Sequence, residues 1–331
     1  VLTILSPNPR TPRPPRSYFN GAPHKIVVFD MGRGITIGIC AYNEGRNIRQ
    51  LFTNLLQDQG LGDLDEIIIV CSGCTDETVP IAEFFAKADG RIKVLLEPER
   101  RGKASAVNLI LREAKGEIIV FMGADVIPGE LAIRRLVQRL SSWEDLGIVS
   151  GTPEPIRNET LAERISSIVW ALHNRTLEAL SDRLVYACGE LYGLKRSIVG
   201  SIPKWVVNDD AYVAKRAEEM GYRSEICGGA KVYIRAPRTV LDYVAQRRRI
   251  TFGHLQLWRR IGLYPGCVEN AALKSPSLLL RTAIQMVLGR PSELPYLLAG
   301  IILEAFAAIL ALIDTLRGKS HSLWEIARTT K

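Results

Sequence analysis

Four short apolar runs alternate with segments of helical periodicity in the first part of the chain, and this alternation most restricts the fold. The apolar runs are residues 34–40, 65–70, 91–96 and 117–122, and the helical segments between them are residues 47–57, 76–88 and 103–114. Strands that are apolar at nearly every position are typical of a parallel sheet covered by helices on both faces. The pattern therefore predicts an α/β fold in which ligands bind beyond the carboxyl ends of the strands.

A second feature is an apolar segment near the C-terminus. Residues 296–313 contain a single charged side chain. A membrane-spanning helix needs about 20 apolar residues, so this segment, extended slightly at each end, is just long enough. Arg317 and Lys319 follow it, as cytoplasmic anchors would. Residues 275–291 before it are apolar over about half a span, which favours an interfacial helix. A buried core helix is the alternative interpretation of residues 296–313.

Composition excludes several classes of protein. Of 331 residues, 47% are hydrophobic and 24% are charged. This is ordinary globular usage and not that of a disordered or coiled-coil chain. The net charge of +8 favours partners that carry phosphate or anionic lipid. This charge lies beside the apolar segment and not among exposed aromatic residues, so we expect no nucleic-acid partner. The six cysteines are scattered, which argues against a secreted disulfide framework.

Three regions follow from these patterns. Residues 1–33 are rich in Pro and Arg and are predicted to be a flexible or membrane-surface arm. Residues 34–238 are predicted to form the soluble α/β domain. Residues 239–331 are predicted to hold a basic amphipathic helix, at 239–262, followed by the membrane helices.

Small and polar residues follow each predicted strand and form a series of motifs. The motifs are A-Y-N-E at 41–44, V-C-S-G-C-T-D-E-T at 70–78, R-R-G-K-A-S-A-V-N at 100–108, G-A-D-V at 123–126, V-N-D-D-A at 207–211 and Q-R-R-R-I at 246–250. In this order they resemble glycosyltransferase family 2, the inverting nucleotide-sugar transferases of GT-A fold. That family includes the dolichyl-phosphate-sugar synthases and the cellulose-synthase-like enzymes. The resemblance extends from about Gly34 to Gly253 and implies a Rossmann-like GT-A nucleotide-sugar-binding domain with C-terminal amphipathic and transmembrane helices.

The resemblance implies a donor site built from several of these motifs. It assigns nucleotide-sugar binding to Ala41, Tyr42, Glu44, Ser72, Lys103, Asp125, Gln246 and Arg249. Lys103 can meet a phosphate as a point charge at a helix N-terminus. Cys71 and Ser72 stand where the family usually has two aspartates, so uridine and guanosine donors both remain open. Cys71 and Cys74 also form a C-x-x-C motif, but no second Cys or His pair complements it as a zinc site.

The motif at 123–126 corresponds to the family's metal-binding D-x-D. Gly123 replaces the first acid, and Asp125 matches the last, metal-binding aspartate. One carboxylate together with the donor's diphosphate suits a divalent cation, Mg²⁺ or Mn²⁺, because such ions prefer oxygen ligands. An aspartate that caps a helix beginning at Pro128 is the alternative.

Catalysis is assigned to the two adjacent acids of V-N-D-D-A, which resembles the family's T-E-D. Asp209 takes the Glu position and Asp210 that of the catalytic base; two acids that favour a helix dipole are the plainer interpretation. The segment from Gly189 matches the acceptor-side strand and places Glu190 and Tyr192 near the sugar.

The last motif, Q-R-R-R-I, resembles Q-x-x-R-W. Gln246 and Arg249 match, while Ile250 replaces the tryptophan that stacks on the growing chain in processive synthases. Non-processive transfer is therefore expected. A second interpretation of Arg247, Arg248 and Arg249 is a basic helix that faces lipid. A role in the site and a lipid-facing role are compatible, because successive side chains of a helix point in different directions.

These features predict a metal-dependent inverting hexosyltransferase at the cell membrane with its catalytic domain in the cytoplasm. We expect a hexose, mannose from GDP-mannose or else glucose, to pass from a nucleotide sugar to a polyprenyl- or dolichyl-linked glycan in the biosynthesis of a glycan or N-glycan precursor, with membrane lipid as a further partner. One alternative is a dolichyl-phosphate-sugar synthase, whose acceptor is the lipid phosphate itself. Another is a non-catalytic membrane protein that binds nucleotide sugars.

Overall fold

A computed structural model describes residues 34–57, 64–156, 159–180, 183–262 and 274–319, together with Cys267, Asn270 and His321. The arm predicted at residues 1–33 lies outside the described residues. The parallel part of the sheet consists of β1 (Ile35–Ala41), β2 (Leu64–Ser72), β3 (Ile92–Glu97) and β4 (Ile118–Gly123). Between these strands run α1 (Gly45–Gln57), α2 (Thr78–Ala88) and α3 (Lys103–Glu113). These elements agree with the predicted strands and helices to within about two residues at each end, as element boundaries usually do.

Both faces of this half-sheet are buried, which explains its nearly continuous apolar strands. Ile37 and Ile39 of β1 and Ile67 of β2 pack into the core under α1 and α2, while Ile68 and Val70 pack on the other face under α3. The strand order is β3-β2-β1-β4, and all three pairings are parallel. The carboxyl ends of β1, β2 and β4 therefore meet along one edge of the sheet.

The second half of the sheet is mixed. It contains β5 (Ile127–Pro128), β6 (Leu146–Pro155), β7 (Leu191–Lys195) and β8 (Arg223–Ile234). The full order is β3-β2-β1-β4-β7-β6-β8-β5, in which β7 runs antiparallel to both β4 and β6. The parallel sheet expected from the sequence is therefore corrected to a mixed one, parallel from β3 to β4. Because β7 enters the sheet in the opposite direction, its first residues lie at the same edge as the ends of β1 and β4.

Helices surround the second half of the sheet. They are α4 (Ala132–Ser141), α5 (Leu161–Glu178), the short η2 (Arg196–Ile198), α6 (Asp209–Glu219) and α7 (Val240–Ile261). Thr160 and Glu163 form a reciprocal capping box at the start of α5, and Thr239 caps α7 by accepting from the backbone N–H of Asp242, both of which satisfy backbone donors of a first turn. Gly262 ends α7 at a positive φ of 73°. This conformation favours glycine after a helix.

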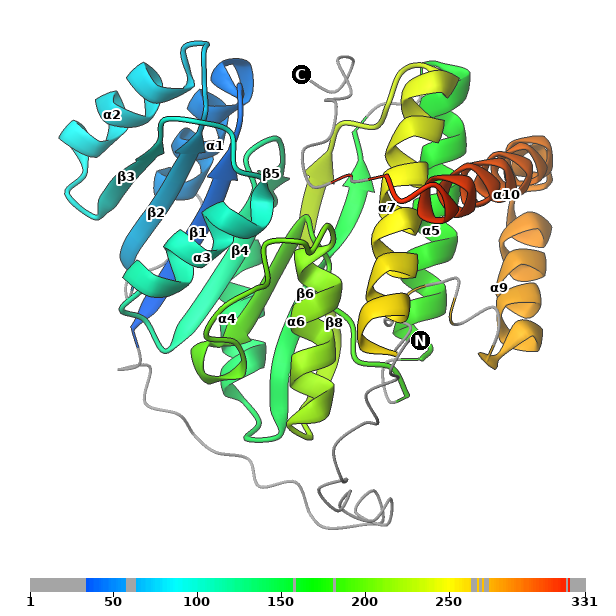
Figure 1. Cartoon of the computed structure of the whole chain (residues 1–331). Coiled ribbons are helices and arrows are strands. Elements are labelled where there is room, and N and C mark those ends of the chain that lie inside the picture. The colour runs from blue at the N-terminus through cyan, green and yellow to red at the C-terminus, as the bar shows by residue number, and fades with distance from the viewer. Residues whose placement is uncertain are drawn as a thin grey trace, which may run out of the picture.

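The chain continues through α9 (Pro276–Gly289) and η3 (Pro291–Glu293) into α10 (Leu294–Leu316). Helix α10 packs against α7 and α5 and crosses both in Figure 1. Gly300 allows the close approach to α5, because a Cβ there would lie 2.9 Å from the Cγ2 of Val169. Among the described residues, one helical stretch, Pro291–Leu316, is long and apolar enough to cross a membrane. Its most apolar stretch is 22% buried, so the core-helix alternative does not describe it well.

Candidate active site

A cavity of about 410 Å³ lies at the edge of the sheet where β1, β2 and β4 end and β7 begins. Helices α5 and α7 close it on the side away from β1. Almost all the residues assigned from the sequence line this one cavity. They are Ala41, Tyr42, Glu44, Ser72, Lys103, Asp125, Gly189, Glu190, Asp209, Asp210, Gln246 and Arg249. Their roles remain predictions. The fold nevertheless brings six motifs together, of which the first and the last are more than 200 positions apart in the sequence.

Tyr192 is the exception. Its side chain is fully buried and does not line the cavity. The ring stacks on Phe121 of β4, with 5.5 Å between ring centroids. Tyr192 was expected near the sugar, and this expectation is corrected, because its side chain lies behind the wall of the cavity. Position 192 alternates with Leu191 along β7, so its side chain points into the core under α3 and α6.

The first two loops are joined by hydrogen bonds. The backbone N–H of Thr75 donates to the Oδ1 of Asn43 at 2.8 Å, and the N–H of Gly45 donates to the Oδ2 of Asp76 at 2.9 Å. Asn43 adopts a positive φ of 52°. Asparagine tolerates this conformation better than most residues. The polar residues Thr75 and Asp76 thus hold the shape of this wall of the cavity.

Arg100 belongs to the site in a way that sequence reasoning missed. Its guanidinium carbon lies 4.0 Å from the centroid of the Tyr42 ring, a cation–π contact between the first and third loops. Gly73 has a positive φ of 64°, and a Cβ there would lie 2.5 Å from the backbone nitrogen of Arg100. Only a glycine at position 73 allows the loops to approach this closely. A spacing rule could not find the pair, because Tyr42 and Arg100 meet only in the folded chain.

Lys103 and Asp209 form an ion pair inside the cavity. The Nζ of Lys103 lies 3.0 Å from the Oδ1 of Asp209, whose side chain is almost completely buried. Burial by itself would lower the pKa of Lys103, but the charges of Asp209 and Asp210 outweigh it and raise that pKa above its usual value, since opposite charges favour the charged form. The lysine therefore stays charged beside the two acids.

Asp210 has a different environment from its neighbour. Burial, followed by the nearby charge of Asp209, raises the pKa of Asp210 to about 6, and the charge of Lys103 opposes the rise. Burial and a like charge both penalise an ionised carboxylate. Gly189 makes room for this carboxylate, since a Cβ at position 189 would lie 2.8 Å from the Oδ2 of Asp210. A carboxylate with a pKa near neutrality suits proton transfer.

Two more charged groups face the same space. Burial raises the pKa of Glu190, whose Oε2 accepts a hydrogen bond from the Sγ of Cys188 at 3.3 Å. Burial lowers the pKa of Arg249, and the charges of Asp210, Asp209 and Glu190 act against that lowering. The cavity thus combines several basic side chains with a group of carboxylates.

Few protein side chains in the cavity are grouped so that they could act together as ligands for a divalent cation. The described residues contain no group of three or more His, Cys, Asp or Glu side chains that could hold a metal ion by themselves. Asp125 lines the cavity after β4, and a Cβ at Gly123 would lie 2.8 Å from its Oδ1. The Asp125 carboxylate therefore occupies the space beside the position where D-x-D would place its first acid. This arrangement fits a cation held jointly by one carboxylate and the oxygens of a diphosphate.

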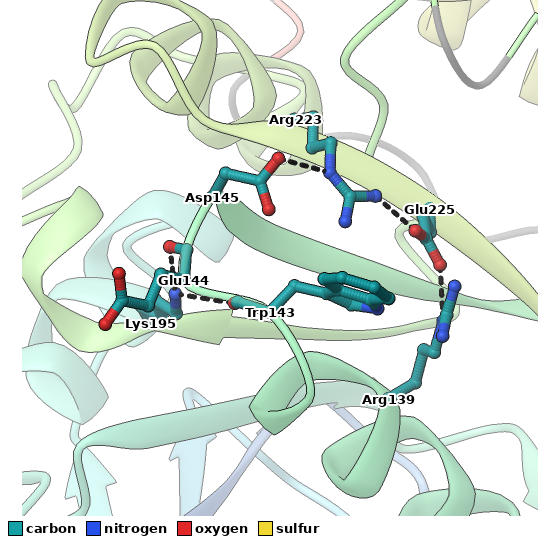
Figure 2. Close-up of polar contacts among 7 residues, drawn as sticks. All are labelled: Arg139, Trp143, Glu144, Asp145, Lys195, Arg223 and Glu225. Atoms are coloured by element: carbon teal, nitrogen blue, oxygen red, sulfur yellow. Dashed lines mark hydrogen bonds and ion pairs between the residues drawn. The ribbon is translucent and has the colours of Figure 1, made fainter. Parts of the chain in front are cut away.

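A second depression, of about 670 Å³, lies at the opposite ends of β4 and β7. Figure 2 shows that charged groups near it are already paired with each other. Arg139 donates to Glu225 at 2.5 Å, and Arg223 donates to Asp145 at 2.7 Å. Lys195 donates to the backbone carbonyls of Trp143 and Glu144. These contacts join α4, β6, β7 and β8, so we regard this end of the sheet as structural.

Comparison with known proteins tests the family to which the motifs of the first cavity point. Residues 36–199 match the family described as glycosyl transferase family 2. These residues form a domain of this family. The chain is therefore a glycosyltransferase, as the motifs predicted, and the alternative of a non-catalytic binding protein is set aside. The matched range contains the cavity residues from Ala41 to Glu190, whereas Asp209, Asp210 and Arg249 lie beyond it.

Two curated relatives are similar to this chain over about two thirds of its length. It is 24% identical over 229 residues to the glycosyltransferase AglE of Haloferax volcanii, and the alignment covers 68% of this chain and 74% of AglE. It is 26% identical over 223 residues to a poly-β-1,6-N-acetyl-D-glucosamine synthase of Staphylococcus aureus. That alignment covers 65% of this chain, but the chain spans only about half, 53%, of the synthase.

The fold of this glycosyltransferase is similar to that of a solved structure over nearly its whole length. The mannosyltransferase PcManGT from Pyrobaculum calidifontis, solved in complex with GDP-Man and Mn²⁺, superposes with a TM-score of 0.65 at 22% identity. The match covers 90% of this chain and 92% of PcManGT. The expected GT-A fold is thereby confirmed.

Proposed function

We propose that this enzyme transfers a hexose, mannose from GDP-mannose, to a polyprenyl- or dolichyl-linked glycan with inversion at the anomeric carbon. The observation that carries the proposal is the Asp210 carboxylate in the cavity, beside Gly189 and with its pKa raised to about 6. In the proposed reaction an acceptor hydroxyl oxygen forms a bond to the anomeric carbon, and Asp210 takes the hydroxyl proton. The bond from that carbon to the diphosphate breaks, and the nucleoside diphosphate leaves with its electron pair.

The leaving diphosphate gains negative charge, which the cavity's cations would stabilise. An ammonium has three donors, so Lys103 has donors for phosphate oxygens besides its bond to Asp209. Arg249 brings a second permanent charge to the same region. A divalent cation, Mg²⁺ or Mn²⁺, held by Asp125 and the diphosphate would supply further positive charge at the leaving group.

The choice of GDP-mannose over other donors is supported by the fold of PcManGT, whose solved complex holds GDP-Man and Mn²⁺. Neither Cys71 nor Ser72 can bind a base as an aspartate would, so the residues of the second loop favour no particular base. The Tyr42 ring and the Arg100 guanidinium offer flat surfaces on which any nucleobase can stack.

A lipid-linked acceptor at the cell membrane is supported by the apolar surface of the C-terminal helices. Large apolar side chains are exposed on α9 and along one side of α10. They are Leu280, Ile284, Leu288, Leu294, Leu298, Ile301, Ile302, Phe306, Ile309, Leu312 and Leu316. Exposed apolar surface of this extent marks a membrane or protein contact. Because α10 packs on α7, which lines the cavity, a membrane contact would bring lipid-linked substrates close to the catalytic residues.

The experiment that tests the donor is a thermal-shift screen of GDP- and UDP-sugars with and without Mn²⁺. A true donor at about 100 times its Kd adds roughly 2.7 kcal/mol of apparent stability. We expect GDP-mannose with Mn²⁺ to raise the unfolding temperature most. The donor that stabilises is then incubated with a polyprenyl-linked sugar and with polyprenyl phosphate. Transfer to the sugar supports the proposal, and transfer to the phosphate alone supports the dolichyl-phosphate-sugar synthase alternative.

A further inference from the structure

Two acidic side chains interrupt the otherwise apolar helix α10, and both face α7. Glu304 accepts a hydrogen bond from the Oη of Tyr243 at 2.5 Å and forms an ion pair of 2.8 Å with the Nε of Arg247. Asp314 is completely buried and accepts two bonds from Arg248, from Nε at 2.6 Å and from Nη2 at 2.5 Å. Acids in an apolar helix are costly unless paired, so these contacts account for their presence there.

The partners of these acids are consecutive residues of one helix. Arg247 and Arg248 were open to interpretation as lipid-facing residues, but both instead pair with acids of α10. Arg249 follows directly and lines the catalytic cavity, as Arg247 also does in part. Successive positions on a helix point about 100° apart, so the two paired arginines leave the third directed away from their partners. Arg248 is thus directed to α10 and Arg249 to the active site, while Arg247 contacts both.

The two ion pairs hold α7 at separate points along α10. Glu304 and Asp314 are ten positions apart in the sequence. Ten residues span roughly 15 Å along the axis of an α-helix. Apolar contacts fill the interface near both pairs, with Ala307 packing near Tyr243 and Ala311 near Phe252. Two separate attachments restrict the rotation of α7 as well as its position along its axis, and rotation is the motion that would displace the Arg249 side chain most.

Helix α7 is also tied to the segment that carries the catalytic acids. The Nδ2 of Asn208 donates to the backbone carbonyl of Ile250 at 2.9 Å. Gly253 permits this contact, since a Cβ there would lie 2.4 Å from the side-chain oxygen of Asn208. Asn208 directly precedes Asp209 and Asp210. The position of α7 therefore affects where the Arg249 guanidinium lies and where the two acids Asp209 and Asp210 lie.

We propose that Glu304 and Asp314 are positioning residues for Arg249. By pairing with Arg247 and Arg248, they set the rotation of α7 that directs the Arg249 guanidinium into the diphosphate region of the cavity. The helix with the exposed apolar surface is then part of the catalytic apparatus as well as a contact for the membrane. This inference rests on the proposed role of Arg249 toward the diphosphate.

The test uses the full chain in detergent micelles and the variants Asp314→Asn, Glu304→Gln and Arg249→Gln, singly and combined. We expect each α10 variant to lower kcat/KM for the donor by roughly tenfold to a hundredfold, the range that a small misplacement of a binding group produces. In the Arg249→Gln background, the same α10 substitutions should change kcat/KM less than about twofold, because the group they position is already absent. Asp314→Glu and Glu304→Asp keep the negative charge, so they should retain part of the activity that Asp314→Asn and Glu304→Gln lose.

Glu293→Gln is the matched control, since Glu293 pairs locally with Arg290 at 3.2 Å and is expected to leave kcat/KM unchanged. If the buried Asp314→Asn variant does not fold, the half-buried Glu304→Gln variant carries the same comparison. An α10 variant with wild-type kcat/KM, or one whose loss is equally large with and without Arg249, overturns the inference and leaves the proposed function standing. A wild-type kcat/KM for Arg249→Gln would instead refute the proposed role of Arg249, and the inference with it.

Discussion

The Lys103 ammonium and the Asp209 carboxylate lie 3.0 Å apart across the cavity, between the first turn of α3 and the first turn of α6. This pair separates two neighbouring acids into different roles. Asp209 is engaged by a cation, whereas Asp210 has its pKa raised to about 6 by burial and by the charge of Asp209. One acid of the pair is thus suited to hold Lys103 in place, and the other to accept a proton.

Replacement of the proposed base tests the reaction type. Asp210→Asn should lower kcat by about 10²- to 10⁴-fold, because it removes general-base catalysis. Donor binding should stay close to that of the wild type, since the cations of the cavity remain. Nucleoside diphosphate release measures kcat, and calorimetry measures the donor Kd. A kcat within about tenfold of the wild type would refute the base assignment. It would favour a phosphate acceptor, which is already ionised.

The pKa of Asp210 predicts how activity depends on pH. The base acts as the carboxylate, so activity is present above the pKa of about 6 and is lost as the pH falls through it. Below that value kcat/KM should fall about tenfold per pH unit. A pH–rate profile from about 4.5 to 8 at constant ionic strength measures this limb, with stability checked at each pH. The residual activity of Asp210→Asn should lack the limb, and its persistence in that variant would assign it to another group.

Removal of the carboxylate at the end of β4 tests the cation site. GDP-mannose at about 100 times its Kd should stabilise the enzyme by roughly 2.7 kcal/mol. Asp125→Asn should abolish the part of this stabilisation that depends on Mn²⁺. The physical reason is that Asp125 is the one protein carboxylate we assign to the cation. Thermal unfolding with and without Mn²⁺ measures it. Asp145→Asn, at the opposite end of the sheet, is the control. An unchanged Mn²⁺ effect in Asp125→Asn would place the cation elsewhere.

The exposed face of α10 gives a prediction about membranes. Ile302→Arg should weaken binding to phospholipid vesicles by about 2.5–3.5 kcal/mol, the cost of an arginine in the centre of the hydrocarbon layer. Ile302 is 67% exposed and takes no part in the ion pairs with α7. Vesicle co-sedimentation measures the binding. Leu241→Arg on α7, where the wild-type side chain is 83% exposed, is the matched control. Equal losses in both variants would argue against α10 as the membrane contact.

Much of the fold was predictable because its elements have strong local signals. The strands β1, β2 and β4 are buried on both faces, and parallel strands of this kind are typically apolar at nearly every position. Helix α10 coincides with the segment 294–316, since a long and mostly apolar run has a clear beginning and end. The strands β6 and β8 were not predicted. Gly147 and Gly151 interrupt β6, and Gly228 and Gly229 interrupt β8, which weakens the apolar pattern that marks a strand.

The candidate site was predictable in its membership but not in its contacts. The motifs placed the residues from Ala41 to Asp125 on loops that follow the predicted strands, and the carboxyl edge of the sheet brings such loops together. The inward direction of Tyr192 depends on the register of β7, and a shift of one residue would have reversed it. The contact of Arg100 with Tyr42 depends on the positive φ of Gly73, which no residue count reveals.

By itself, the sequence determined the family, the parallel half of the sheet and the apolar helix at the C-terminus, because these depend on residue type and local spacing. Only the tertiary structure decided that β7 runs antiparallel, that Lys103 engages Asp209 and leaves Asp210 as the acid with the raised pKa, and that Arg247 and Arg248 pair with α10. These are contacts between residues far apart in the chain. Their formation depends on how packed elements are oriented, and a charge pattern alone carries no information about which opposite charge it will meet.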